Sequence, residues 1–295
     1  MPSSNLIAPQ ADALSGPAAL TAWDIPSLVH GFCGRTGGVS AGPFATFNLA
    51  EWVGDDPNAI AENWRRWNAR YPNLRVARLS QVHGKLVHRI DLSHIVPAHL
   101  VPSHDGKRRE GDGMVTATAG IALGVFTADC VPILMVDADR RVAGALHAGW
   151  RGMLAGIAEE GVRAMIALGA RPESIRAALG PSISICCFEV DAALAEDFIR
   201  QIPGARDHAR TGNFTHEIPG VGDAARTGRP GKAYLDLRAI IRLQLEREGL
   251  ASASIADIGP CTRCANDSYF SRRGAGGNGS NTTSGLQISF IGFAE

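Results

Sequence analysis

Three separated residues of metal-ligand type are the clearest chemical signal in this sequence. His83 lies in Ser-Gln-Val-His-Gly, Cys130 in Thr-Ala-Asp-Cys-Val-Pro, and His147 in Leu-His-Ala-Gly-Trp-Arg-Gly. Two imidazoles and one thiolate suit zinc or copper, and three protein ligands leave one coordination position open for water or substrate. The trio therefore predicts a catalytic metal site that would hold zinc or copper.

The same three residues have two other interpretations. Each one alone is most often a buried cysteine or a hydrogen-bonded core histidine. No local zinc-knuckle spacing joins them, so the ligands must converge from three separate elements. Cys130 flanked in space by His83 and His147 would equally suit a thiolate nucleophile, as in a cysteine hydrolase.

Polar residues beside the trio suggest further roles. Asp129 precedes Cys130, where it would orient a ligand or accept a proton from a metal-bound water of pKa near ~7. The alternative is that Asp129 only forms a turn. Arg151 follows His147 at the expected start of a helix, where free N–H groups and a guanidinium would bind phosphate or carboxylate, unless this helix end only faces water. Arg35, in the Gly-rich turn 34–40, is a second candidate for anion binding.

A second cysteine motif, Cys261-Thr262-Arg263-Cys264, stands alone as a Cys-x-x-Cys pair. A four-cysteine zinc site requires a second pair, which we do not expect here, and a thioredoxin-type motif should begin a helix after a strand. Zinc deaminases of bases combine a His- or Cys-x-Glu element with Pro-Cys-x-x-Cys. Cys187-Phe188-Glu189 and Pro260-Cys261 fit that pattern, but more than seventy residues separate the two halves, which makes the match weak.

Short apolar runs surround the trio and predict the elements that position it. Residues 121–126, 131–136 and 142–146 are almost continuously apolar, the pattern of strands buried on both faces of a sheet. Cys130 and His147 lie at the edges of these runs. His83 lies between strands expected at 74–82 and 86–90, which places it at a strand end. Strand-end loops often hold functional groups on a rigid scaffold.

The remaining elements alternate along the chain. We expect further strands at 28–33, 175–179, 255–258 and 286–291, helices at 59–70, 153–168, 192–202 and 237–248, and loops at 97–109, 203–231 and 271–284. Alternating strands and helices predict an α/β fold, a single layered domain with a mixed β-sheet flanked by helices. We expect this domain at 26–295, after a loosely ordered segment at 1–25.

The composition limits the classes of binding partner that we expect. Lys plus Arg equals Asp plus Glu at 29 each, so no electrostatic footprint for nucleic acid or an anionic membrane is present. No run approaches the ~20 apolar residues of a membrane helix, and the first residues do not resemble a secretory signal. Six cysteines are too sparse for a disulfide scaffold and fit a reducing cytosol. We expect a cytoplasmic protein with a small-molecule substrate.

Nine motifs, taken in order, resemble the polyphenol oxidase or laccase-domain family over about residues 28–293. The motifs are Arg35-Thr36-Gly37-Gly38-Val39-Ser40, Asn48-Leu49, Gln81-Val82-His83-Gly84, Asp112, Thr127-Ala128-Asp129-Cys130-Val131-Pro132, His147-Ala148-Gly149-Trp150-Arg151-Gly152, Leu179-Gly180-Pro181-Ser182, Cys187-Phe188-Glu189-Val190, and Cys261-Thr262-Arg263-Cys264 with Phe270-Ser271-Arg272-Arg273.

The resemblance implies an activity. Members of this family have been described as multicopper polyphenol oxidases and, more recently, as purine nucleoside phosphorylases with adenosine deaminase activity. It implies a metal, commonly zinc, at His83, Cys130 and His147. It further implies phosphorolysis of adenosine, inosine and methylthioadenosine, together with hydrolytic deamination of adenosine. We expect a monomer or a homodimer. Nine histidines are few for several copper ions, which weighs against the older description.

These observations together lead to a prediction of residue roles. We expect Cys130, Asp129 and Arg151 to be catalytic, and Arg35, Asn48 and Arg151 to bind purine nucleosides and phosphate. The chain departs from the family pattern near its end, where Leu286 follows Gly285 in place of an arginine. If that arginine helps to bind substrate in relatives, substrate choice differs here.

Overall fold

Two β-sheets form the centre of the molecule. The computed structural model describes residues 19–72, 74–94, 109–211, 215–217, 225–227, 229–276 and 283–295. The five-stranded sheet has the order β1 (Ala19–Leu20), β2 (Leu28–Cys33), β16 (Gln287–Phe293), β6 (Ile121–Thr127) and β3 (Arg75–Ala77). The six-stranded sheet has the order β15 (Ile255–Asp257), β9 (Arg176–Leu179), β7 (Val131–Asp137), β8 (Val142–Ala148), β5 (Gly113–Thr116) and β4 (Val87–Arg89). Both sheets mix parallel and antiparallel pairs.

The two sheets pack face to face, which explains the continuous apolar runs. Every residue of β6, β7 and β8 is buried. In β7, Leu134 and Val136 face the core between the sheets, whereas Ile133 and Met135 face the core beneath the helices. Because side chains alternate across a strand, a strand covered on both sides must be apolar at every position.

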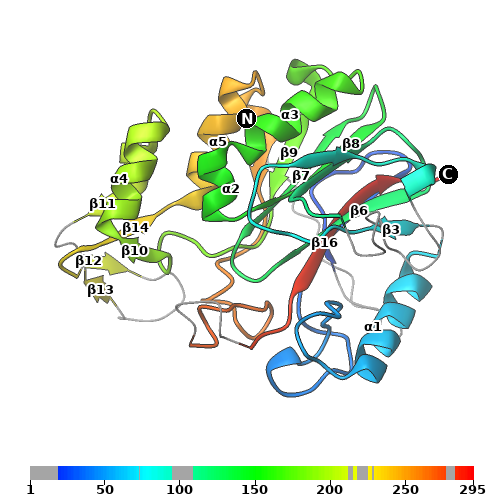
Figure 1. Ribbon diagram of the computed structural model, residues 1–295, viewed down its shortest axis with the longest axis horizontal. Helices are drawn as coiled ribbons and strands as arrows, with labels where there is room; N and C mark the ends of the chain where they lie inside the picture. The colour runs from blue at the N-terminus through cyan, green and yellow to red at the C-terminus, as the bar shows by residue number, and fades with distance from the viewer. Residues whose placement is uncertain are drawn as a thin grey trace.

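One long helix covers the outer face of the five-stranded sheet. Helix α1 (Pro57–Arg70) places Trp64 and Trp67 in a core with Phe290 of β16, and the Trp67 and Phe290 rings meet edge to face at 5.4 Å. The carboxylate of Asp56 accepts a hydrogen bond from the Asn58 backbone N–H at 2.9 Å and caps the helix. Figure 1 shows α1 on one side of the sheets and the other helices on the opposite side.

The outer face of the six-stranded sheet lies under α2 (Trp150–Ala155), α3 (Ile157–Ala167) and α5 (Leu237–Arg247). The expectation of one continuous helix at 153–168 is wrong. Gly156, at φ +93°, ends α2 in a left-handed conformation that glycine adopts readily, and α3 begins directly after it. The start of α2 at Trp150 agrees with the helix start expected directly after His147.

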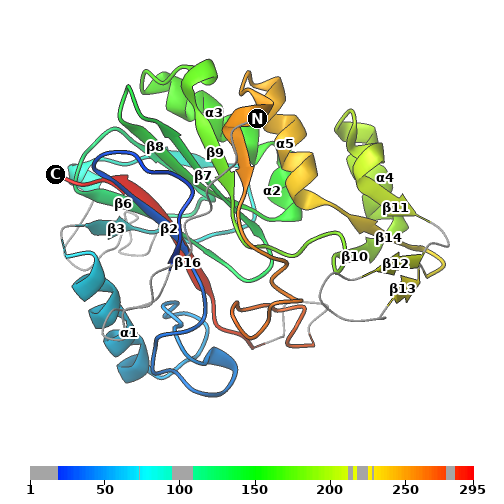
Figure 2. The same cartoon turned by 180° about the vertical axis from the view of Figure 1, so that it is seen from behind.

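A smaller unit of α4 (Ala192–Gln201) and three short strands lies beside these helices (Figure 2). Its strands are β10 (Glu189–Asp191), β14 (Lys232–Leu235) and β11 (Ala209–Thr211). The expectation of a loop throughout 203–231 is wrong, because β11, the pair β12 (Thr215–Glu217) and β13 (Ala225–Thr227), and a 3-10 helix form there. Short 3-10 helices occur at Gly42–Phe44, Leu92–His94, Pro172–Ser174, Ala205–His208 and Ser252–Ser254.

The predicted fold class, an α/β fold with a mixed sheet flanked by helices, is confirmed. The described residues form two large central sheets and two small ones, where one sheet was expected. Strands β5, β10 and β14 were not expected. The single-domain boundaries at 26–295 stay a prediction. Of the segment expected to be loose, residues 19 and 20 form β1, which pairs with β2, and residues 1–18 lie outside the described residues. The expected loops at 97–109 and 271–284 also fall partly outside them. In the described part of the chain, every helix is too short or too polar to cross a membrane.

Candidate metal centre

The structure brings His83, Cys130 and His147 together. Their potential ligand atoms all lie within 4.8 Å of one another, and His83 Nε2 is 3.9 Å from Cys130 Sγ. Cys130 directly precedes β7, and His147 lies near the end of β8, where it pairs with Pro132. Antiparallel pairing of β7 and β8 therefore places two of the three ligands side by side.

His83 reaches the site from a loop, not from a strand end as predicted. Strand β3 ends at Ala77 and β4 begins at Val87, and His83 has a positive φ of +61°. The side chain of Gln81 fastens this loop to β6, because its amide exchanges two hydrogen bonds of 2.8 Å with the backbone of Phe126.

Asp112 organises the loop and the opposing histidine, a role that the sequence did not reveal. Its fully buried carboxylate accepts hydrogen bonds from the backbone N–H groups of Val82, His83 and Gly84 at 3.2, 2.9 and 2.7 Å. It also lies 2.8 Å from Nδ1 of His147, which leaves Nε2 available as a ligand atom. A carboxylate on the far nitrogen of a histidine is the usual support for a metal ligand. An acid between two glycines before a strand was the only local signal.

The site favours a thiolate beside an imidazolium when no metal is present. Burial alone would raise the pKa of Cys130, but the charge and hydrogen bond of His147 and the hydrogen bond of His83 lower this pKa to about 6. Burial alone would lower the pKa of His147, but the Cys130 thiolate and Asp112 raise it to about 9. Burial opposes ionisation of Asp112 too, yet His147 and the backbone N–H groups hold its pKa below the usual value. Both a metal ligand and a nucleophile require such a thiolate.

Gly149 leaves no room for a side chain behind the ligands. A Cβ at this position would lie 2.6 Å from Cδ2 of His83 and 3.3 Å from Sγ of Cys130. Close packing against the trio therefore explains why the Gly-Trp-Arg-Gly motif begins with glycine.

The trio lies on the wall of a cavity of about 620 Å³, a volume typical of small-molecule sites. Aromatic and polar side chains line it together. Trp52 and Phe126 meet edge to face at 5.1 Å, and Glu51 and Gln81 contribute polar groups. Leu286, which follows Gly285 near the start of β16, also lines this cavity.

Two cavity residues carry polar atoms without a partner. In the described part of the chain, Nε of Arg272 and Oγ1 of Thr127 are buried and make no hydrogen bond. Buried polar groups are normally paired, so unpaired ones beside a cavity are candidates to bind a ligand or water there. Sequence reasoning assigned neither residue a role, although both belong to family motifs.

Asp129 turns its carboxylate away from the trio. It accepts hydrogen bonds from Oγ1 of Thr262 at 2.7 Å, Oγ of Ser271 at 2.6 Å and the backbone N–H of Arg273 at 2.8 Å. With φ at +98°, Asp129 forms the bend that leads into Cys130. Its predicted catalytic role stays a prediction, and these contacts favour a role in positioning Cys130.

The other predicted substrate contacts lie outside the cavity wall. Arg151 is exposed and stacks on the Trp150 ring at 4.4 Å. Arg35 donates to the backbone oxygens of Ala45 at 2.6 Å and Asn266 at 2.8 Å. Asn48 is fully buried. Its side-chain amide donates hydrogen bonds to the Asp55 carboxylate and the Ala50 carbonyl, and accepts one from the backbone N–H of Leu286. The substrate-binding roles of these three residues stay predictions. The observed hydrogen bonds of Arg35 and Asn48 instead connect separate loops of the protein.

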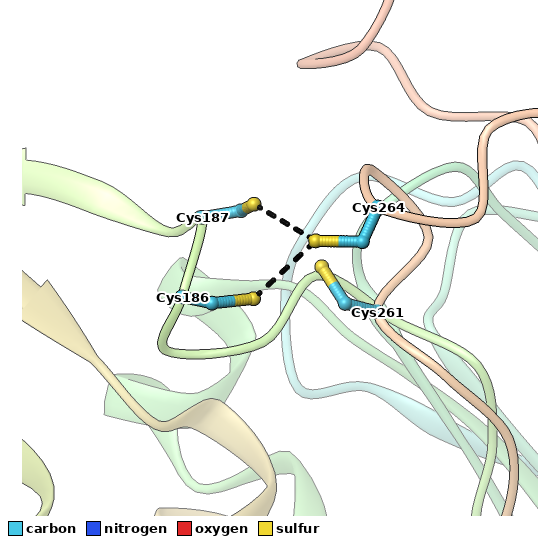
Figure 3. A group of neighbouring side chains, drawn as sticks. All are labelled: Cys186, Cys187, Cys261 and Cys264. Carbon is cyan, nitrogen blue, oxygen red and sulfur yellow. Dashed lines mark hydrogen bonds between the residues drawn. The ribbon is translucent and has the colours of Figure 1, made fainter. Parts of the chain in front are cut away.

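The expectation that the Cys261 motif lacks a second cysteine pair is wrong. Cys186 and Cys187 lie opposite it, and all four sulfur atoms are within 4.8 Å of one another (Figure 3). The pairs meet because the segments after β9 and β15, which are parallel neighbours in the sheet, leave it side by side. Local spacing does not reveal this convergence.

The comparison with known proteins decides the family. Residues 29–294 match the family described as multi-copper polyphenol oxidoreductase laccase. The chain belongs to this family. A protein named purine nucleoside phosphorylase from Mycobacterium tuberculosis is 39% identical over 241 residues, which cover 81% of this chain and 84% of the relative.

Two further relatives of the laccase-family chain bear on fold and activity. A protein named adenosine deaminase, from an unknown prokaryotic organism, is 38% identical over 175 residues, 59% of this chain and 61% of the relative. The crystal structure of YlmD from Geobacillus stearothermophilus superposes with a TM-score of 0.79 at 30% identity, covering 97% of this chain and 98% of that chain. The α/β arrangement described above is thus that of a solved family member.

Proposed function

We propose that this protein is a metal-dependent purine nucleoside phosphorylase acting on adenosine, inosine and methylthioadenosine, with adenosine deaminase activity. The observation that carries the proposal is the cavity that joins the His83, Cys130 and His147 trio to the unpaired Nε of Arg272. The names of two relatives, purine nucleoside phosphorylase and adenosine deaminase, support purine nucleosides as the substrate class.

The residues present fit a zinc ion. With Zn–S near ~2.3 Å and Zn–N near ~2.0 Å, tetrahedral geometry separates sulfur and nitrogen ligands by roughly 3.5 Å. The observed 3.9 Å between Cys130 Sγ and His83 Nε2 is close to this value, and Asp112 fixes the His147 ring through its other nitrogen. When bound, the ion supplies Lewis-acid chemistry at one side of the cavity.

The cavity residues have clear tasks in phosphorolysis. A phosphate oxygen forms a bond to C1′ of the ribose, and the bond from C1′ to N9 of the purine breaks. Arg272 would hold the phosphate, because a guanidinium offers charged donors matched to its oxygens. The Thr127 hydroxyl would donate a further hydrogen bond. Trp52 and Phe126 provide aromatic surface for the purine, which leaves with the electron pair and a proton from solvent or a polar wall group.

Product analysis tests the proposed function. Incubation of pure protein with adenosine and phosphate should produce adenine and ribose 1-phosphate, and adenosine without phosphate should produce inosine and ammonia. Removal of bound metal by a chelator should abolish both reactions, and added zinc should restore them. A fully metallated preparation that turns over no purine nucleoside would contradict the proposal.

A second candidate, a cysteine hydrolase, is favoured by one geometric observation. Cys130, His147 and Asp112 form a series in which the acid contacts Nδ1 of His147 and the thiol lies on its other side. This is the order of nucleophile, base and orienting acid in cysteine hydrolases. Ester or amide hydrolysis by metal-free protein, lost on alkylation of Cys130 and inhibited by zinc, would identify this activity.

Metal analysis separates zinc from copper. The phosphorylase proposal expects zinc at the trio even after growth in copper-replete medium. Copper bound at the trio, with oxidation of phenols, would instead support the polyphenol oxidase alternative. A cytoplasmic location and a monomer or homodimer stay predictions, and sedimentation analysis of the purified protein would determine the oligomeric state.

A further inference from the structure

A second group of metal-ligand residues lies apart from the proposed active site. Cys186 and Cys187 follow β9, and Cys261 and Cys264 follow β15. None of the four belongs to the cavity wall described above. Figure 3 shows their sulfur atoms turned toward one common point from two opposing loops.

The sulfur separations match a mononuclear tetrathiolate site. Cys264 Sγ lies 3.5 Å from Cys187 Sγ and 3.7 Å from Cys186 Sγ. A zinc ion with four Zn–S bonds of about 2.3 Å separates its sulfurs by roughly 3.8 Å. From this geometry we propose that Cys186, Cys187, Cys261 and Cys264 bind one structural zinc ion. Binding exchanges the thiol protons, which pass to solvent, for the ion.

Main-chain contacts organise the backbone around the cysteines. Ser182 forms a parallel bridge with Cys261, and its carbonyl accepts the Thr262 N–H at 3.1 Å. The Ser184 N–H donates to Sγ of Cys261 at 3.4 Å. An N–H donor on a sulfur stabilises a thiolate and orients it as a ligand. The two cysteine pairs therefore hold their relative position through main-chain contacts.

Arginines lie near this cluster and offset the negative charge that four thiolates and one zinc ion carry. The guanidinium of Arg273 interacts electrostatically with Cys187, and Arg263 lies between Cys261 and Cys264. Arg273 also donates to the backbone oxygen of Glu189 at 2.9 Å, which fixes it beside the cluster. A net negative metal site next to fixed guanidinium groups is electrostatically favourable.

A disulfide explains the arrangement less well. A disulfide joins two sulfurs at about 2.05 Å and leaves the other two without a function. Here Cys264 contacts two sulfurs at similar distances, and the four sulfurs form one group. A shared central ligand accounts for all four positions at once.

The site is closed, which distinguishes it from a deaminase centre. In the deaminase pattern three ligands leave a position for water, and the glutamate faces that water. Here Cys186 supplies a fourth ligand. The Glu189 carboxylate instead accepts the Tyr234 hydroxyl at 2.8 Å and pairs with Arg229. The cluster can therefore stabilise structure but has no open coordination position for substrate.

The cluster connects to the trio through Thr262. This residue lies between the two cysteines of the second pair, is fully buried, and donates to Asp129 at 2.7 Å. Asp129 directly precedes Cys130 in the sequence. A zinc ion in the cluster would thus fix the loop that holds Asp129 in position. It would act on the trio from outside the cavity, without contacting substrate.

Metal counting on the full chain tests the proposal independently of the proposed function. In a His83→Ala/Cys130→Ala variant, which lacks two ligands of the trio, we expect about one zinc ion per chain by elemental analysis. Adding Cys264→Ser should remove this zinc, whereas Ser268→Ala, an exposed neighbour whose backbone contacts are retained, should keep it. Cobalt substitution should produce the intense visible absorption of a tetrahedral thiolate site.

A measurement on the unmutated protein tests the proposal even if the cysteine variants fail to fold. Titration of its thiols with a mercurial reagent should release zinc that a colorimetric chelator detects, and this release should persist in the His83→Ala/Cys130→Ala variant. Three results would overturn the proposal: no zinc in that folded variant, iron in place of zinc, or a disulfide between any two of the four cysteines in freshly purified protein. Absence of nucleoside phosphorolysis would leave it untouched, because the cluster lies outside the cavity.

Discussion

At the scale of single residues, Arg272 and Arg151 are competing candidates for binding phosphate. Arg272 lines the cavity with an unpaired buried Nε, whereas Arg151 is exposed on Trp150. A charged hydrogen bond contributes about 1.5–3 kcal/mol, so we expect Arg272→Ala to raise the KM for phosphate roughly ten- to hundredfold. Steady-state kinetics at varied phosphate checks this. A larger effect of Arg151→Ala than of Arg272→Ala would favour the prediction made from the sequence.

Asp112 is the second residue-scale test, because it supports the trio without belonging to it. Replacement by asparagine removes the charge that faces Nδ1 of His147. Loss of such an outer partner commonly weakens metal binding 10–100-fold, so we expect Asp112→Asn to lower zinc affinity by about this factor. Competition with a chelator measures it.

A matched control for this test is Asp137→Asn. Asp137 is equally buried, and its carboxylate accepts hydrogen bonds from the backbone N–H groups of Arg140 and Arg171. This variant should lose stability and keep its zinc affinity. Equal zinc affinity in the two variants would mean that Asp112 supports the fold and not the metal.

At the scale of elements, the β8–α2 connection should be sensitive to a single methyl group. In Gly149→Ala the new Cβ would lie 2.6 Å from His83, so we expect displacement of the His83 ring and loss of bound zinc. Gly161→Ala in α3 creates a comparable contact, 2.5 Å from Leu146, within the core. Both should lose about 1–3 kcal/mol of stability by overpacking, but only the first should lose metal, as measured by denaturation and elemental analysis. Zinc retained by folded Gly149→Ala would exclude this packing role.

At the scale of the whole molecule, His30 ties the first described segment to the five-stranded sheet. Its Nε2 accepts the backbone N–H groups of Ala22 and Trp23 at 2.9 and 3.2 Å, and burial lowers its pKa to about 4. Above pH 6.5 His30 is neutral in both states, so its contribution to stability is fully present. As the pH falls below 6.5 the unfolded chain binds the proton first, and stability falls until about pH 4.

This linkage amounts to about 3 kcal/mol, and urea unfolding at neutral and mildly acidic pH measures it. In His30→Gln the amide oxygen can still accept a hydrogen bond but does not titrate in this range. The variant should therefore lose less stability on acidification than the parent protein. Identical pH dependence of the two proteins would show that His30 does not titrate as its burial requires.

Much of the molecule follows from local sequence. Strand β2 occupies the predicted residues, and the apolar runs at β6, β7 and β8 correctly indicated strands buried on both faces. The spacing of apolar side chains indicates which faces of a helix or strand are buried, and capping residues indicate where a helix begins. The same local information placed Cys130 and His147 at neighbouring strand ends, so the trio could be proposed before its geometry was known.

The sequence by itself determined the residue types of the trio, the buried strands and the family resemblance. Only the tertiary structure brought Asp112 to His147, placed Arg272 in the cavity wall with Arg151 outside it, and joined Cys186 and Cys187 to Cys261 and Cys264. The physical reason is that hydrophobic periodicity acts along one element. Which loops meet depends instead on the order and register of strands distant in sequence, such as β9 and β15.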